Sequence, residues 1–271
     1  MCLSVCVQEI KRITVTGVDH VHGVTSVDNE LFVLLYQVFN QVAVYSINDY
    51  QLLRHLHLPG LKLHFRNDMK SCVRHKCLYV SDYYHACIHR YDLAARSITR
   101  KWTVPGGAQP CGLSVIPGGN LLVTCPCPNK LLELSVDNGQ CVREIALPSD
   151  IRCPSHGVQL TTGQYVVCHG LMNLQRVCIV DGDGRVTRSY GGQRGSDVGQ
   201  LNWPNHMDVD KNSQFIYVTD RGNNRVVLLS PTLEFVRYVR EKLSNPNRLH
   251  LNHTTRRLYV TQYNDVVVIQ L

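Results

Sequence analysis

A repeat of about 45 residues runs through almost the whole chain, and it constrains the fold more than any other feature. Its clearest copy spans residues 190–240, where a glycine-rich entry and Pro204 lead into an alternating segment. Two short apolar segments, 216–220 and 226–229, follow it. Equivalent inner segments are centred on residues 23, 68, 112, 157, 206 and 248, which lie 42 to 49 residues apart. A fixed period of this length, rich in short strands, is typical of a propeller blade.

Turn sequences separate the predicted strands, as at 117–119, 137–139 and 181–184, and they have the chemistry that tight hairpins require. No apolar pattern at helical period runs long enough to compete with this interpretation. We therefore predict an all-β fold, a six-bladed β-propeller that occupies residues 1–271 as a single domain. The predicted blades lie near residues 17–60, 61–106, 107–150, 151–190, 191–243 and 244–271.

The last copy of the repeat lacks its outermost strand, because the sequence stops at Leu271 after the third segment. Residues 8–16 precede the first copy and have strand character, with Ile10, Ile13 and Val15 as their apolar positions. We predict that these residues supply the missing strand of the last blade. Such closure joins the two ends of the chain and leaves no long exposed sheet edge.

The composition fits a folded globular domain, with 44% hydrophobic and 18% charged residues. No apolar run reaches the roughly 20 residues that a membrane helix needs, so we expect no membrane partner. Residues 1–7 are too short an apolar stretch for a signal peptide, which predicts a cytoplasmic protein. In that compartment we expect the twelve cysteines to be free thiols and largely structural, and the close pair Cys125 and Cys127 not to bind zinc.

The fifth copy resembles an NHL repeat. The resemblance rests on Gly-Gln-Leu at 199–201, Pro204, and Tyr-Val-Thr-Asp-Arg-Gly-Asn-Asn-Arg-Val at 217–226, with looser echoes at 78–82 and 258–262. It implies a six-bladed propeller like the C-terminal domains of tripartite-motif ubiquitin ligases, which bind RNA stem-loops or protein partners. Related six-bladed folds also include zinc-dependent lyases and calcium-dependent lactonases. No RING, B-box or coiled coil lies in these residues, so no ligase activity is predicted from them.

Polar residues are predicted to gather at one mouth of the central channel, where the innermost strands begin. The predicted ring comprises His22, Asn67, Cys111, His156, Asn205 and Asn247, with His206 and Arg248 next in line. We interpret this ring as a water-filled polar lining without metal or cofactor. Calcium prefers several oxygen ligands that include carboxylates, and this ring has no carboxylate. Zinc would suit His22 and His156 better, with Cys111 or His206 as a third ligand.

Basic and aromatic side chains are predicted to share the loops around the same mouth. The net charge of +7 and the pI near 8.8 favour an anionic partner. The predicted partner-binding residues are Lys62, Arg66, Tyr83, Tyr84, Lys130, Arg152, Arg176, Arg194, Trp203, Arg221, Arg225 and Arg248, and loop 37–40 belongs to the same face. We expect Arg221 and Arg225 to lie on a loop tip.

These patterns predict a non-catalytic binding platform whose partner is a protein or a structured RNA. Guanidinium and ammonium groups can meet phosphates, and exposed rings can stack on unpaired bases. The alternative is a metal-dependent propeller hydrolase or lyase with its site at the channel mouth. No nucleophile elbow, phosphate-binding loop or dinucleotide fingerprint is present in the sequence.

Overall fold

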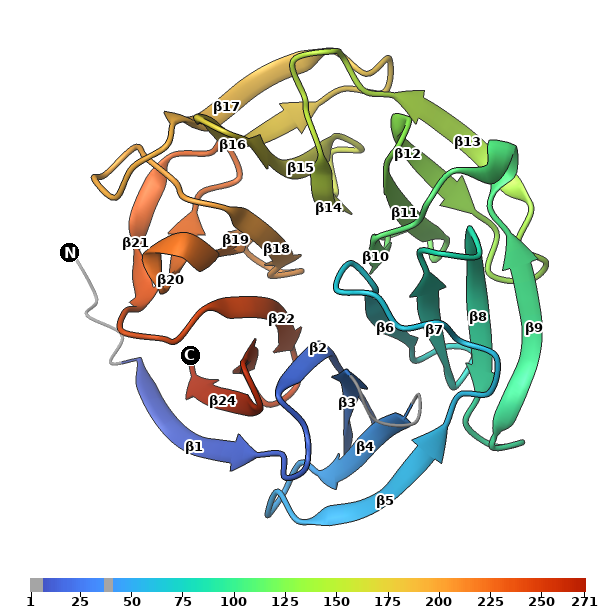
Figure 1. Cartoon of the computed structure of the whole chain (residues 1–271). Helices are drawn as coiled ribbons and strands as arrows, with labels where there is room; N and C mark the ends of the chain where they lie inside the picture. Colours follow the sequence, from blue (N-terminus) through green and yellow to red (C-terminus); the bar gives the residue numbers. More distant parts are fainter. Residues whose placement is uncertain (1–6, 37–40) are drawn as a thin grey trace.

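The strands of the computed structural model form six antiparallel four-stranded sheets around a central channel (Figure 1). The structure describes residues 7–36 and 41–271. Blade one holds β2 (His20–Val27), β3 (Glu30–Tyr36), β4 (Gln41–Ser46) and β5 (Leu52–His57). Blade two holds β6 (Met69–Cys72), β7 (Cys77–Asp82), β8 (Cys87–Asp92) and β9 (Ser97–Thr103). Blade three holds β10 (Gly112–Val115), β11 (Leu121–Pro126), β12 (Asn129–Leu134) and β13 (Cys141–Ala146).

The remaining blades complete the ring in chain order. Blade four holds β14 (Pro154–Gln159), β15 (Tyr165–Leu171), β16 (Leu174–Val180) and β17 (Val186–Gln193). Blade five holds β18 (Pro204–Val209), β19 (Ile216–Asp220), β20 (Arg225–Leu229) and β21 (Phe235–Arg240). Blade six holds β22 (Pro246–Asn252), β23 (Arg257–Gln262), β24 (Asp265–Gln270) and β1 (Gln8–Thr14). Two short 3₁₀ turns, η1 (Pro105–Gly107) and η2 (Arg221–Asn223), lie between strands. The prediction of an all-β six-bladed propeller is confirmed.

The closing strand is also confirmed, because β1 pairs with β24 along its length, from Gln8 opposite Gln270 to Thr14 opposite Asp265. The Thr14 hydroxyl donates to an Asp265 carboxylate oxygen at 2.8 Å. Ile13 and Val15 are buried beside this pairing. The first and last strands of the chain therefore lie in one sheet, at the outer side of blade six (Figure 1).

Burial follows the position of each strand in its blade. The middle strands are almost wholly buried, as in β7, where every residue is buried, because each face packs on a neighbouring blade. The outermost strands are mostly exposed, as in β9 and β13, and keep a few buried apolar positions. The sequence pattern of short apolar runs is thus the consequence of blades that are covered on both faces.

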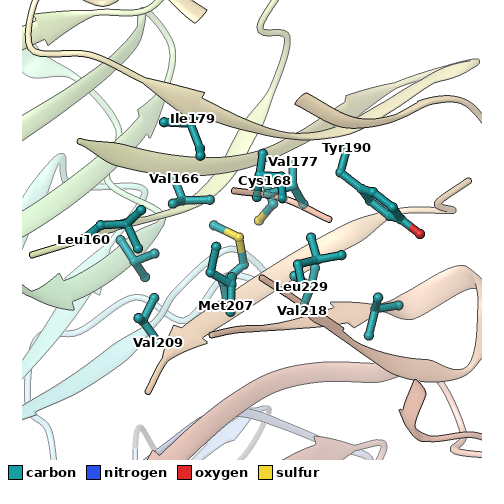
Figure 2. Packing of buried hydrophobic residues seen from close by; sticks show 14 of the residues in the cluster. Leu160, Val166, Cys168, Val177, Ile179, Tyr190, Met207, Val209, Val218 and Leu229 are labelled. Atoms are coloured by element: carbon teal, nitrogen blue, oxygen red, sulfur yellow. The ribbon is translucent and has the colours of Figure 1, made fainter. Parts of the chain in front are cut away.

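Six apolar clusters hold neighbouring blades together. Between blades four and five, Val166 and Cys168 of β15 pack near Met207 and Val218 of the next blade (Figure 2). Cys168 is fully buried here, and burial raises the pKa of its thiol to about 11. In the described part of the chain every cysteine is free, in agreement with the prediction of unpaired thiols. No helix of the described residues is long and apolar enough to cross a membrane.

Candidate functional site

The inner strands of the six blades run in the same direction along the channel, so the two ends of the channel can be told apart. We call the end where they begin the upper mouth, and the end where they finish the lower mouth. A cavity of about 290 Å³ opens at the upper mouth, lined by residues of blades two to six. Cys111, Asn205 and Asn247 of the predicted ring line it, and the Asn205 amide donates to the Asn247 side-chain oxygen at 2.6 Å.

The lining of the upper cavity is positively charged. Arg66, Arg221 and Arg248 contribute to it, and no aspartate or glutamate is among its lining residues. Trp203 and Met172 lie at its rim, and they are 53% and 80% exposed. An electropositive hollow with exposed apolar edges is suited to an anionic ligand that also carries flat or apolar groups.

Beneath this cavity lies a fully buried polar group that we call the Asp68 cluster, made of Asp68, His156, His206 and Arg248. One Asp68 oxygen lies 3.3 Å from His206 Nε2 and 3.7 Å from His156 Nε2, and the other lies 3.4 Å from Arg248 Nε. The backbone N–H groups of Met69 and Leu113 donate to the carboxylate at 2.9 Å. Burial alone would raise the pKa of Asp68, but His206 and Arg248 lower it below its ordinary value.

The Asp68 cluster corrects the metal group that the sequence analysis considered. One ligand atom each of Asp68, His156 and His206 lies within 4.8 Å of the others, so these three residues could hold an ion. His22 is not in this group, and its ring stacks on that of Tyr36 with the ring centres 4.4 Å apart. The Cys111 thiol donates to the Thr124 carbonyl, and burial raises the thiol pKa to about 12. Burial therefore favours the protonated thiol, and Cys111 is not among the described residues whose ligand atoms lie close to those of Asp68, His156 and His206.

Arg248 supplies the cluster with positive charge without a metal. Its guanidinium pairs with Asp68 and also donates to the Asn67 carbonyl at 3.2 Å. The backbone has room for the histidines because residue 112 is glycine: a Cβ at Gly112 would lie 2.8 Å from the His156 ring. The cluster therefore has the properties of a structural core of the channel, with charge and hydrogen bonds supplied by the protein.

A second group with metal-ligand chemistry lies in blade two and comprises Asp82, Cys87 and His89. One Asp82 oxygen already accepts hydrogen bonds from His85 Nδ1 at 2.7 Å, His89 Nε2 at 3.2 Å and the Lys62 backbone at 3.2 Å. Asp82 thus anchors the loop that leads into β6, and we assign it this structural role.

The upper face around blade two carries a compact set of rings and cations that we call the blade-two corner. Its members are Lys62, His64, Phe65, Arg66, Tyr83 and Tyr84. His64 stacks on Tyr83 at 4.4 Å, and the Lys62 ammonium lies 4.3 Å from the centre of the Tyr84 ring. Phe65 and Tyr84 remain about half exposed. The structure therefore brings together four predicted residues, and it adds His64 and Phe65.

The other predicted surface residues divide into two groups. Arg152 and Arg194 are exposed, and Arg194 lies 5.8 Å from the Trp203 ring centre. Arg176 pairs with Asp150 at 2.7 Å, and Arg221 is partly buried and bonded to Asn245. These residues remain on the upper face, although Arg176 is partly neutralised. Loop 37–40 lies outside the described residues.

The structure buries three of the predicted contact residues, and the expected loop-tip position of Arg225 is wrong. Arg225 does not lie on a loop tip: it pairs with buried Asp220 at 2.8 Å and donates to two backbone carbonyls. Arg248 belongs to the Asp68 cluster. Lys130 is 7% exposed and pairs with Glu144 at 3.1 Å. The sequence shows that a basic residue follows a turn, but it does not show which carboxylate or carbonyl group the basic side chain pairs with.

The larger cavity, about 700 Å³, lies at the lower mouth and was not predicted. Lys70, Asp208, His250 and Ser26 line it, on four different blades. Lys70 Nζ lies 3.2 Å from an Asp208 carboxylate oxygen. The first three of these residues lie two positions after the centre of their own repeat, so the repeat phase could have shown that they share one level of the channel.

The fold and the two mouths define the class of this protein, a closed six-bladed β-propeller. It is similar over 98% of its length to virginiamycin B lyase from Staphylococcus aureus (12% identity, TM-score 0.67, 99% of that chain). A catalytically inactive variant of the same lyase with quinupristin matches at 14% identity and a TM-score of 0.66, over 98% and 99% of the two chains. Kuenenia stuttgartiensis hydrazine synthase matches at 16% identity and 0.66, over 94% and 97%.

These similarities establish the propeller fold alone, since the identities are far below those of a shared family. Neither a protein-family model nor a curated protein sequence matches the chain. The resemblance of blade five to an NHL repeat is therefore not confirmed at the level of a family, while the six-bladed fold that it implied is.

Buried histidines predict acid sensitivity of the fold. Burial lowers the pKa of His22 to about 3 and that of His169 to about 4. Their unfolded forms, with a pKa near 6.5, bind protons first as the pH falls, so stability decreases from about pH 7 down to the folded pKa. A histidine lowered to about 4 contributes a loss of about 3 kcal/mol by pH 4.

The measurement is the free energy of unfolding by urea at several values between pH 7 and pH 4. We expect His22→Phe, which keeps a ring beside Tyr36, to make this dependence shallower. Removal of His22 should reduce the slope of the unfolding free energy against pH by up to about 1.4 kcal/mol per pH unit. An unchanged slope in this variant would contradict a neutral, buried His22.

Proposed function

We propose that the upper face is a non-catalytic platform that binds unpaired segments of structured RNA. The observation that carries the proposal is the upper cavity, which has no carboxylate in its lining and which Arg66 and Arg221 line without a carboxylate partner among the described residues, whereas Arg248 is paired with Asp68. The phosphate groups of a nucleic acid are repeated anions that a surface with this charge can bind. Arginine pairs with a phosphate through two parallel hydrogen bonds.

The exposed rings favour RNA over a protein partner. Phe65, Tyr84 and Trp203 are each about half exposed and lie beside a lysine or an arginine. Proteins that read single-stranded RNA use this combination, because rings stack on unpaired bases while cations hold the backbone. In a longer protein of the tripartite-motif type, or another cytoplasmic protein, this face would be the recognition part.

The metal-dependent hydrolase or lyase is the second candidate. It is favoured by the spacing of Asp68, His156 and His206 and by the similarity in fold to lyases. Against it, Arg248 already neutralises Asp68. Metal analysis of freshly purified protein separates the two: about one zinc or calcium per chain that is lost in His206→Ala would favour this candidate over the platform.

Charge reversal on the upper face tests the RNA proposal. We expect Arg66→Glu with Arg194→Glu to weaken binding of a labelled RNA hairpin with a long mixed-sequence loop by at least about 10-fold, through lost phosphate contacts. Arg74→Glu is the matched control, because Arg74 lies at the lower mouth. Trp203→Ala should cost about 1–3 kcal/mol of binding free energy if a base stacks there.

The measurement is fluorescence anisotropy of the RNA at low salt. Equal affinities for the upper-face variants and Arg74→Glu would contradict the proposal, and so would the absence of any binding by the unaltered protein. In that case a protein partner becomes the remaining occupant of this face.

A further inference from the structure

We propose that Ser26, His250 and Asp208 form a catalytic triad at the lower mouth, which hydrolyses carboxylic esters that enter the adjoining cavity. Ser26 Oγ lies 2.7 Å from His250 Nε2, and His250 Nδ1 lies 3.5 Å from an Asp208 carboxylate oxygen. This inference is independent of the RNA proposal, because it concerns the opposite end of the channel. A nucleophile, a base and an orienting carboxylate in this order are recognised by geometry and not by their place in the sequence.

The hydrogen-bond directions fit these roles. The Asn252 side-chain oxygen accepts from the backbone of Thr254 and Thr255, so its amide nitrogen is the group that faces Ser26, at 3.0 Å. An amide nitrogen only donates. Ser26 Oγ therefore accepts from Asn252 and directs its own proton to His250 Nε2, which leaves the ring proton on Nδ1. This nitrogen makes no hydrogen bond among the described residues, and an Asp208 oxygen lies 3.5 Å from it.

The surroundings keep the base neutral and the carboxylate charged. Burial lowers the pKa of His250 to about 4, so the ring is neutral at pH 7. Burial would raise the pKa of Asp208, but Lys70 and His250 hold it well below its ordinary value. The backbone N–H groups of Val209 and Leu251 donate to the two Asp208 oxygens at 3.0 Å and fix the carboxylate.

The cavity provides room for the substrate and a donor for the developing charge. Its volume of about 700 Å³ is within the range of small-molecule sites, and Val73, Val115 and Ile116 give it an apolar wall. The Asn252 amide donates one N–H to Ser26 Oγ, and its second N–H is a donor beside the nucleophile for the oxyanion of a tetrahedral intermediate. An ester with an apolar acyl group is the substrate class that this wall accepts.

The reaction then proceeds in two balanced steps. Ser26 Oγ attacks the ester carbonyl as its proton passes to His250 Nε2, and the intermediate collapses to acyl-Ser26 while His250 returns the proton to the leaving alcohol. Water attacks the acyl group in the second step with His250 again as the base, and the carboxylic acid leaves. No co-reactant other than water is needed.

A covalent probe tests the triad in the intact protein. A fluorophosphonate, followed by mass spectrometry of peptides, should modify Ser26 in the unaltered chain and not in His250→Gln. We expect Ser26→Ala to reduce the hydrolysis of p-nitrophenyl acetate at least about 10²-fold. Ser114→Ala is the matched control, because Ser114 lines the same cavity but donates to the Gly157 carbonyl.

The outcomes separate catalysis from a structural hydrogen bond. Labelling of Ser26 that depends on His250 supports the triad, and urea unfolding of each variant shows whether a loss of activity follows from a loss of fold. An unlabelled Ser26 in the folded, unaltered protein, or hydrolysis equal in Ser26→Ala and Ser114→Ala, would overturn the proposal.

Discussion

Removal of residues 1–16 is expected to lower the free energy of unfolding by about 3–6 kcal/mol, because it takes the outer strand from blade six. Ile13 and Val15 would lose their buried contacts, and the β24 edge would lose its partner strand. The truncation also removes the pair between Glu9 and Arg240, which ties blade six to blade five at 2.6 Å. Urea unfolding of the truncated and full-length chains measures the effect.

A single substitution in the same strand gives the matched comparison. Ile13→Ala should cost about 2–5 kcal/mol, since Ile13 is 5% exposed, whereas Ile10→Ala should cost little, since Ile10 is 40% exposed. A truncated chain as stable as the full-length chain would show that β1 does not hold the ring closed.

Replacement of Asp68 by alanine is expected to destabilise the protein by about 3–5 kcal/mol, because it leaves the buried Arg248 guanidinium without its counter-charge. The backbone N–H groups of Met69 and Leu113 would also lose their acceptor. Asp68→Asn should cost less, because an amide oxygen can still accept from the backbone. The measurement is again the free energy of unfolding.

Asp197→Ala is the control for this experiment, because Asp197 is exposed on an upper-face loop. If Asp68→Ala and Asp197→Ala were equally stable, the Asp68 cluster would not be a structural core of the channel. A destabilisation that appears in the unaltered protein on addition of a chelator would instead indicate that an ion shares the site.

The fold could be predicted from the sequence because each blade repeats the same pattern of short apolar segments and turns. The strand that closes the ring was also predictable, since blade six lacks one strand and residues 8–16 can supply it. Both inferences depend on local pattern and on counting. Neither requires knowledge of which side chains meet across the channel.

The sites could be predicted only in part, because contacts across the channel depend on how the blades tilt toward one another. Asp68 lies in blade two, yet it pairs with histidines of blades four and five and an arginine of blade six. Ser26, Asp208 and His250 come from three consecutive blades around the ring closure. The repeat phase places these residues at common levels of the channel, but the distances between their side chains cannot be read from the spacing.

Whether a given arginine is buried in an ion pair or lines the cavity was the least predictable property. Arg221 and Arg225 stand four residues apart, Arg221 in η2 and Arg225 at the start of β20, yet Arg225 pairs with Asp220 while Arg221 lines the upper cavity. The difference comes from the direction of each side chain where β19 ends and β20 begins. The alternation of side chains along a strand predicts these directions only when the exact end of the strand is known.

The salt dependence of RNA binding is the most direct test of the upper face as a binding platform. Five basic residues, Lys62, Arg66, Arg152, Arg194 and Arg221, remain available there. If each meets a phosphate of single-stranded RNA, the dissociation constant should rise by about 10²-fold between 50 and 200 mM salt. A dissociation constant that does not change with salt, or no RNA retained at 50 mM, would contradict the account.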